Sequence, residues 1–151
     1  MSYTQLFYHI VIRTKYSYKT IPDEHSEDLY KYINGFVKNK KSVLYKVNGI
    51  SDHIHLFVSL HPTIALSDFI RDLKTSTNKW MKSQSGFPDF TGWGRMYAAF
   101  TCNNYGIERL TNYITNQKEH HRKKPFEEEY RKLIQEAGIE INETYFLKDE
   151  D

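Results

Sequence analysis

The sequence predicts an α+β fold in which helices cover one mostly antiparallel sheet, with the element order β-α-β-β-α-β followed by two more helices. Short runs of β-branched and aromatic residues alternate along the chain with stretches whose apolar residues recur every three or four positions. One such run ends in Asn48-Gly49, a turn signal that is typical of a hairpin. With 151 residues, 39% of them hydrophobic, the chain is large enough to bury the core of one domain.

The first half of the chain contains three predicted strands and one helix. Residues 3–13 are apolar and β-prone, which predicts the first strand. A helix of about 15 residues follows Pro22, because acidic residues open it and its apolar positions recur at spacings of three and four. These positions are Leu29, Tyr32, Ile33, Phe36 and Val37. Residues 41–49 and 53–60 predict the second and third strands, and the short break between them indicates a hairpin.

The second half begins with a helix that either Thr63 or Ser67 could cap. Its apolar side contains Leu66, Phe69, Ile70, Leu73, Thr77 and Trp80. Residues 83–95 are rich in Ser, Gly, Pro and Asp and predict a loop, and residues 96–102 predict the fourth strand.

Two helices and a tail complete the chain. The first of these helices spans about residues 107–122. Pro125 opens the second, Gly138 is its expected C-terminal cap, and the last residues are expected to form a loosely packed tail. This order predicts the ferredoxin-like (RRM-like) arrangement, with the first and third strands at the centre of the sheet. The fold hosts many functions and decides none of them.

Composition excludes several classes of protein. No apolar run approaches the roughly 18 residues that a membrane helix needs, and the N-terminus lacks the cleavage site of a signal peptide. The single cysteine, Cys102, excludes an internal disulfide and a multi-cysteine zinc site. Because reduced cysteine is typical of the cytoplasm, we expect a cytoplasmic protein.

Charge is distributed unevenly along the chain. Residues 1–124 contain 18 Lys and Arg against 10 Asp and Glu, a net charge of +8, whereas residues 125–151 carry −6. We treat residues 1–124 as the main domain and residues 125–151 as its acidic C-terminal helix and tail. The basic body is typical of a protein with a polyanionic partner, although ordinary solvated charge explains it equally well. The acidic tail either repels non-specific nucleic acid or docks on the basic body.

The third predicted strand carries the pattern Asp52-His53-Ile54-His55-Leu56. Because side chains alternate across a strand, the two histidines share one face and the apolar residues share the other. Two imidazoles at positions i and i+2 of a rigid central strand can hold one metal ion. The pattern is short, and it also describes two surface histidines.

The helix after the fourth strand contributes a second pair. Tyr113 and Gln117 are one turn apart, so they lie on the same side of that helix, next to its apolar stripe. A tyrosine ring packed on the sheet beside a solvated glutamine is the alternative to a functional pair. Tyr97 and Tyr105 are further candidates if a tyrosine acts as a nucleophile.

Other residues are candidates by position or by charge. His9 on the first strand could stand near a metal on the third strand, or it could be a packed histidine. The basic run at residues 120–124 favours the helix dipole and could touch phosphates. The candidate DNA-backbone contacts are Arg13, Lys15, Arg71, Lys74, Lys79 and Arg122. Each of these cations taken alone could equally be a solvated charge.

Together the motifs resemble the single-tyrosine transposases of the HUH nuclease superfamily, the small TnpA-type and REP-associated tyrosine transposases. Those proteins carry a His-hydrophobic-His pair on a central strand and a Tyr-x-x-x-Gln motif on a downstream helix, and this chain has DHIHLFVSL and YITNQ in that order. The resemblance extends to YHIVIRTKY, LKTSTNKW, WGRMYAAFT and HHRKKPFEEEYRKLIQEAGIEINETYF, so it covers nearly the whole chain.

The resemblance implies a chemistry and its residues. His53, His55 and Gln117 match the family's metal ligands, and Tyr113 matches the nucleophile. The implied activity is metal-dependent cleavage and rejoining of single-stranded DNA at hairpin-flanked element ends, through a 5′-phosphotyrosine. Mg²⁺ or Mn²⁺ is the implied cofactor, although imidazole ligands give only modest affinity for Mg²⁺. One nucleophilic tyrosine per chain and two ends per element imply a homodimer.

Three alternatives remain. A domesticated relative would bind and nick repeat hairpins with the same residues, without mobilising its own gene. A non-catalytic RRM-like module would bind RNA, but residues 8–13 lack the Gly-aromatic pattern of such modules. A metal hydrolase would need a general base beside the histidines, and Asp52 faces the wrong way on an unbroken strand.

Overall fold

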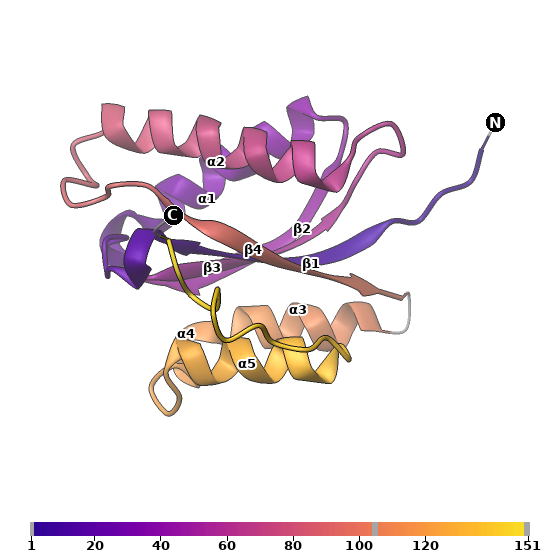
Figure 1. The fold of residues 1–151 in the computed structure, drawn as a ribbon. Coiled ribbons are helices and arrows are strands. Elements are labelled where there is room, and N and C mark those ends of the chain that lie inside the picture. Colours follow the sequence, from indigo (N-terminus) through magenta and orange to yellow (C-terminus); the bar gives the residue numbers. More distant parts are fainter. Residues whose placement is uncertain (1, 104–105, 150–151) are drawn as a thin grey trace.

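The structure is a computed structural model that describes residues 2–103 and 106–149, and its centre is a four-stranded antiparallel sheet (Figure 1). The strands are β1 (Phe7–Thr14), β2 (Val43–Ile50), β3 (His53–Ser59) and β4 (Trp93–Cys102). Their spatial order is β2-β3-β1-β4, so β1 and β3 lie at the centre. This order confirms the predicted ferredoxin-like arrangement.

Helices α1 (Asp23–Asn39) and α2 (Leu66–Ser83) cover one face of the sheet (Figure 1). The main hydrophobic core lies between these two helices and the sheet. The sheet contributes residues that alternate along the two central strands, and all are 0 to 1% exposed: Ile10, Ile12, Ile54, Leu56 and Val58. Their alternation leaves the intervening residues of β1 and β3 for the opposite face.

The opposite face is covered by α3 (Ile107–Thr115), α4 (Gln117–His120) and α5 (Phe126–Glu136) (Figure 1). Helix α3 packs through Ile114 against Phe7 and Phe57. Helix α5 packs through Phe126 and Tyr130 in a separate cluster with Val11 and Ala98. These two small cores flank the centre of the sheet and bring three helices close to the histidines of β3.

The predicted helix over residues 107–122 is wrong in one respect, because the chain interrupts it at Asn116. The side-chain amide of Asn48, on β2, donates hydrogen bonds to the carbonyl oxygens of Ile114 and Thr115, at 3.1 Å each. These bonds add a side-chain donor to carbonyl groups at the end of α3, where intrahelical partners run out. A side chain distant in the sequence therefore anchors the end of α3.

Other element boundaries also differ from the predictions. Ala65 is the N-cap of α2, and neither Thr63 nor Ser67 caps it through a side-chain hydrogen bond. Strand β4 begins at Trp93 rather than at residue 96, because the Trp93 indole is buried and donates a hydrogen bond to Thr77 Oγ1 at 2.8 Å. Packing of this kind overrides the local composition on which the loop prediction rested.

Helix α5 follows Pro125 as predicted, and Gly138 after it has a φ of 76°, the left-handed conformation of a C-terminal cap. The tail beyond it is packed rather than loose. Phe146 stacks on Tyr130 with a centroid distance of 5.8 Å, and the Asp149 carboxylate pairs with Arg13. An aromatic and an ionic anchor thus hold the tail on the domain. None of the helices in the described part of the chain is long and apolar enough to cross a membrane.

Candidate active site

His53 and His55 lie side by side on β3, on the face covered by α3, α4 and α5, and both are 0% exposed. Ile54 and Leu56 point into the core on the other face, so the predicted alternation is confirmed. The two imidazoles are therefore not surface histidines. A buried imidazole has to find polar partners within the protein.

Each of the two rings has one nitrogen engaged by a neighbour. His55 Nδ1 lies 2.8 Å from Nε2 of His9 on β1, and His53 Nδ1 lies 2.7 Å from Oδ1 of Asp52. Partners of this kind fix the orientation of a metal-binding imidazole and leave its Nε2 free to coordinate. The prediction for Asp52 is wrong: the residue belongs to the β2–β3 turn rather than to the strand, so its carboxylate reaches His53.

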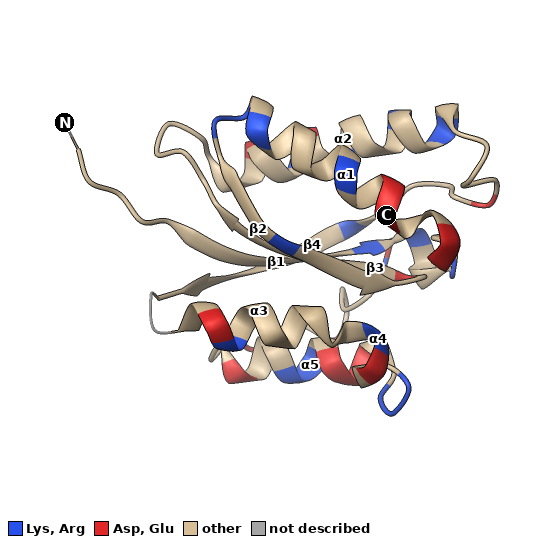
Figure 2. Ribbon diagram, turned by 180° about the vertical axis from the view of Figure 1, so that it is seen from behind, with Lys and Arg blue, Asp and Glu red and all other residues tan. Residues whose placement is uncertain are grey.

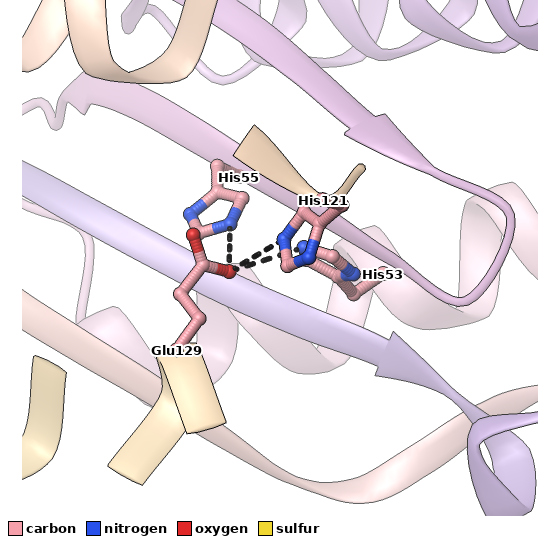
Figure 3. Close-up of side chains that lie close together, drawn as sticks. All are labelled: His53, His55, His121 and Glu129. Carbon is pink, nitrogen blue, oxygen red and sulfur yellow. Dashed lines mark hydrogen bonds and ion pairs between the residues drawn. The ribbon is translucent and has the colours of Figure 1, made fainter. Parts of the chain in front are cut away.

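His121 and Glu129 join this pair, and the sequence analysis missed both. Figure 3 shows the four side chains converging, with the carboxylate of Glu129, on α5, between the rings. Glu129 Oε1 lies 2.9 Å from Nε2 of His121, 3.2 Å from Nε2 of His55 and 3.4 Å from Nε2 of His53. The four ligand atoms lie within 4.8 Å of one another.

The hydrogen-bond partners of the Nδ1 atoms indicate which ring nitrogen carries the proton, and this explains why the cluster suits a cation. His121 Nδ1 lies 2.7 Å from the Lys124 carbonyl oxygen, which can only accept, so Nδ1 carries the ring proton. His53 Nδ1 faces an ionisable carboxylate in the same way. In the neutral rings, the Nε2 lone pairs then point at a carboxylate oxygen, which is unfavourable unless a proton or a cation lies between them.

The spacing of the ligand atoms is also that of a metal centre. Ligands that are each bonded about 2.1 Å from one ion, at tetrahedral or octahedral angles, lie roughly 3.0 to 3.4 Å apart. The distances from Glu129 Oε1 to the three imidazoles fall at or beside this range. These three spacings, in a set whose four ligand atoms all lie within 4.8 Å of one another, are compatible with binding of one divalent cation.

Burial and charge set the protonation of the cluster. Burial lowers the pKa of His9 to about 3 and that of His55 to about 4, so both rings are neutral at neutral pH. Burial would also lower the pKa of His53, but the carboxylates of Asp52 and Glu129 raise it above the ordinary value. Burial opposes ionisation of Glu129, yet its close contacts with the imidazoles of His121, His53 and His55 hold its pKa far below the ordinary value.

Tyr113 and Gln117 face the same carboxylate despite the break at Asn116. Gln117 is 0% exposed, with Oε1 3.3 Å from His53 Nε2, and its amide donates a hydrogen bond to Glu129 Oε2 at 2.9 Å. The Tyr113 hydroxyl donates to the same Oε2 atom. Burial and the Glu129 charge raise the pKa of Tyr113 above its ordinary value. The alternative of a solvated Gln117 is therefore wrong.

Tyr113 opens onto a cleft of about 510 Å³. Helices α3 and α5 and strand β4 line it, and the cleft also reaches His9 and Glu129. Three of the lining side chains are cationic: Arg109, Lys124 and Lys132. Tyr97 lies elsewhere, with its ring 5.8 Å from the Lys74 ammonium, and Tyr105 lies outside the described residues.

The cations predicted to contact the DNA backbone fall into separate groups. The alternative of a solvated charge is wrong for Arg13, because its side chain is 2% exposed and paired with Asp149. Lys74 is half-buried and donates a hydrogen bond to the carbonyl oxygen of Gly94 at 2.9 Å. Lys74 and Lys15 both line a small surface pocket beside Asp149. These three cations gather near one end of β1.

The remaining predicted cations lie apart from this group. Arg71 and Lys79 are exposed on α2, on the opposite side of the sheet from the histidines, and Arg71 pairs with Asp68 and Asp72. Arg122 is exposed in the basic loop between α4 and α5 and pairs with Glu119 at 3.3 Å. Figure 2 shows this loop in blue beside the acidic first turn of α5.

Comparison with known proteins places this chain in a family. The family model "Transposase IS200 like" matches residues 2–117, more than two thirds of the chain. The chain belongs to the IS200-like transposase family. The resemblance to small tyrosine transposases is thereby confirmed. The matched segment of this IS200-like transposase contains His53, His55, Tyr113 and Gln117, whereas His121 and Glu129 lie beyond its end.

Two solved structures resemble the transposase in fold. A candidate transposase from Deinococcus radiodurans R1 is 23% identical, with a TM-score of 0.60 over 77% of this chain and 93% of that one. A REP-associated tyrosine transposase bound to a REP hairpin is 11% identical, with a TM-score of 0.60 over 80% of this chain and 72% of that one. At these identities the likeness shows the fold alone. No curated protein sequence matches the chain significantly.

Proposed function

We propose that this IS200-like transposase cleaves and rejoins single-stranded DNA at hairpin-flanked element ends, with Tyr113 as the nucleophile. One observation carries the proposal: the carboxylate that accepts the Tyr113 hydroxyl also faces the three imidazoles of a metal-type cluster. Membership of the family supports the activity, and the hairpin bound by the REP-associated relative supports the choice of substrate.

The cluster would hold the cation through Nε2 of His53, His55 and His121 and through Glu129, with the Gln117 amide oxygen beside them. A bound Mg²⁺ or Mn²⁺ polarises the scissile phosphate and stabilises the charge that develops on it. Because most of the donors are imidazoles, the set favours Mn²⁺ over Mg²⁺. His9 and Asp52 hold the rings of His55 and His53 in position through their Nδ1 atoms.

Glu129 also acts on the nucleophile. The raised pKa of Tyr113 makes its free hydroxyl a weak nucleophile, so the hydroxyl needs a base during attack. Glu129 Oε2, already hydrogen-bonded to it, takes the proton as the Tyr113 Oη–phosphorus bond forms and the bond from phosphorus to the 3′-oxygen breaks. The departing 3′-oxygen takes a proton from solvent, so the strand leaves with a 3′-OH, and the 5′-phosphotyrosine keeps the energy for rejoining.

The cleft beside Tyr113 is the proposed entry for the strand. Its lining cations, Arg109, Lys124 and Lys132, suit the phosphate backbone. Tyr113 lies in the site of its own chain, so we propose that it acts there rather than in a partner subunit. An element with two ends still needs two tyrosines, which favours a homodimer.

A strand-cleavage assay tests the proposal. Single-stranded oligonucleotides carrying a hairpin-flanked end are labelled on either the 5′ or the 3′ side and incubated with Mn²⁺ or Mg²⁺, then separated on a denaturing gel. We expect the label on the 3′ side of the break to migrate with protein, and chelation with EDTA to prevent this. A protein that binds the strand tightly but forms no adduct would instead be a binding module of the RRM-like kind.

A domesticated relative would give the same adduct. Transfer of the cleaved strand to a second element end separates the two cases, because only a transposase needs this step. A persistent adduct without strand transfer would favour the relative that nicks repeats.

A further inference from the structure

A second concentration of charge lies near one end of β1, around the carboxylate of Asp149. The Arg13 guanidinium donates two parallel hydrogen bonds to this carboxylate, from Nη1 at 2.7 Å and from Nη2 at 2.8 Å. The backbone N–H groups of Tyr16 and Arg95 donate to it at 2.5 and 2.8 Å. Four donors from three residues, in two separate segments of the chain, thus converge on one carboxylate.

The Asp149 carboxylate has more cationic side chains around it than its ion-pair partner Arg13 alone. A hollow of about 360 Å³ adjoins Asp149, and Lys15 and Lys74 line it. Asp149 is the single acidic side chain among the described lining residues. Burial and the nearby charge of Arg13 lower the pKa of Lys74 to about 8. An anion beside these cations is electrostatically favourable.

Gly94 on β4 leaves room for the Arg13 guanidinium beside the sheet. A Cβ atom added to Gly94 on β4 would lie 2.8 Å from Arg13 Nη1, so a larger residue at this position would displace the guanidinium. Both partners of the ion pair are almost fully buried, at 2% and 1% exposure. The pocket is therefore built into the sheet edge and is not a chance pairing of surface side chains.

The pocket also adjoins the candidate active site. Arg13 on β1 pairs directly with His53 on β3 in the antiparallel register. Directly paired residues point to the same face of a sheet, with Cα atoms roughly 4.5 to 5.5 Å apart. A strand whose scissile phosphate reaches the histidine cluster could therefore place a neighbouring phosphate at Arg13.

We propose that Arg13, Lys15, Lys74 and the backbone N–H groups of Tyr16 and Arg95 form a phosphodiester-binding subsite for single-stranded DNA, which Asp149 fills in the free protein. This assignment rests on the proposed function for its substrate. The planar guanidinium fork fits two phosphate oxygens as well as two carboxylate oxygens. Backbone N–H donors contact phosphate without reading a base, so the subsite positions the strand without selecting its sequence.

Binding of a labelled single strand, measured by fluorescence anisotropy across a series of salt concentrations, tests the subsite. All proteins carry Tyr113→Phe, so that no covalent adduct forms. Asp149→Asn removes the competing charge and should tighten binding by roughly tenfold, because the free protein no longer fills its own subsite. The slope of log K against log salt should steepen by about one, as one more phosphate is neutralised.

Two further variants complete the test. Lys74→Gln should weaken binding and reduce the salt slope by about one. Glu143→Gln is the matched control, because Glu143 is a tail carboxylate that pairs with Arg131 at 2.6 Å, away from the pocket. It removes the same charge from the same tail, and we expect it to leave both the affinity and the slope unchanged.

The outcomes separate the subsite from the proposed function. If Asp149→Asn only lowers the Tm and leaves affinity and slope unchanged, the pocket is a structural clasp and the subsite is overturned. If inorganic phosphate raises the Tm of Asp149→Asn while affinity for the strand stays unchanged, the pocket takes a free anion and the subsite is again overturned. Adduct formation by the protein with Tyr113 intact is measured separately, so either idea can fail alone.

Discussion

The hydroxyl of Tyr113 donates a hydrogen bond to the carboxylate of Glu129, whose other oxygen faces the Nε2 atoms of three histidines. Tyr113 lies on α3 and Glu129 on α5, so the contact joins two helices that approach the sheet separately. One carboxylate thereby connects the candidate nucleophile with the candidate metal centre. Its two proposed roles, as a metal ligand and as the proton acceptor for Tyr113, can be measured separately.

Tyr113→Phe removes the nucleophilic oxygen and keeps the ring. The ring packs edge-on against His55 at 5.8 Å, and this packing should survive the change. We expect no covalent adduct and unchanged hairpin binding. The lost hydrogen bond to a charged group should reduce the free energy of unfolding by about 1.5 to 3 kcal/mol. Gel analysis of labelled strands and thermal unfolding measure these effects, and an adduct that persists would assign the nucleophile to another tyrosine.

Glu129→Gln keeps the size of the side chain and removes its charge. We expect the affinity for Mn²⁺ to fall at least tenfold, because a neutral amide oxygen replaces the carboxylate among the ligands. Adduct formation at saturating Mn²⁺ should still fall by about 10²- to 10⁴-fold, because the base for Tyr113 is lost as well. Mn²⁺ titration followed by electron paramagnetic resonance gives the first value, and single-turnover cleavage gives the second.

The neighbouring residue Glu128 supplies the control for this prediction. It is exposed on the same turn of α5, and its carboxylate pairs with Lys124 at 4.0 Å. Glu128→Gln should therefore leave both Mn²⁺ affinity and cleavage unchanged. If the two variants behave alike, the effect is one of net charge and Glu129 has no specific role.

The sequence predicted the part of this site that local periodicity encodes. Strand alternation placed His53 and His55 on one face, and helical spacing placed Tyr113 and Gln117 on one side. The break at Asn116 left that spacing intact, because Gln117 begins the next helical turn. Residues set by one regular element are therefore predictable even when the end of the element is not.

His121 and Glu129 were not predictable in the same way. His121 lies in a basic run, and Glu129 is the last of three consecutive acids at the start of α5, so each is explained by its local charge pattern. One signal was present: Glu129 falls between Phe126 and Tyr130, on the side of α5 that packs against the sheet. An acid within an apolar stripe indicates a buried partner, but only the fold shows which partner it meets.

Asp52→Asn tests the orientation of His53. The Asp52 carboxylate accepts from His53 Nδ1 at 2.7 Å and does not touch the ligand side of the ring. An asparagine keeps the shape but weakens this hydrogen bond, and loss of such a partner costs about 10- to 100-fold in metal affinity. Cleavage at saturating Mn²⁺ should recover most of its rate. Recovery separates a positioning role from a direct one, because a catalytic base at this position would leave cleavage slow at every Mn²⁺ concentration.

Asn48→Ala tests how α3 is anchored. The change removes both hydrogen bonds to the end of α3 and should reduce the free energy of unfolding by about 1 to 3 kcal/mol. Because α3 carries Tyr113 but not the histidines, cleavage should slow more than Mn²⁺ affinity falls. Asn112→Ala, on the exposed side of α3, is the control and should change neither. Equal losses of metal affinity and cleavage would mean that Asn48 supports the whole fold rather than the position of α3.

The pH dependence of stability tests the pairing of Asp149 with Arg13. Burial would raise the pKa of Asp149, but the Arg13 guanidinium and two backbone N–H groups hold it below the ordinary value, which is about 3.9 in an unfolded chain. A carboxyl whose pKa is lower in the folded protein contributes stability above its unfolded pKa and loses it as the pH falls through the folded pKa. Wild type should therefore exceed Asp149→Asn in free energy of unfolding by a constant amount between about pH 8 and pH 5. The difference should begin to shrink as the pH falls below about 4 and should be lost as the pH passes through the lower, folded pKa of Asp149. Chemical denaturation of both proteins at each pH measures this difference. A gap that persists unchanged well below pH 3 would show that the charge of Asp149 does not hold the tail on the sheet.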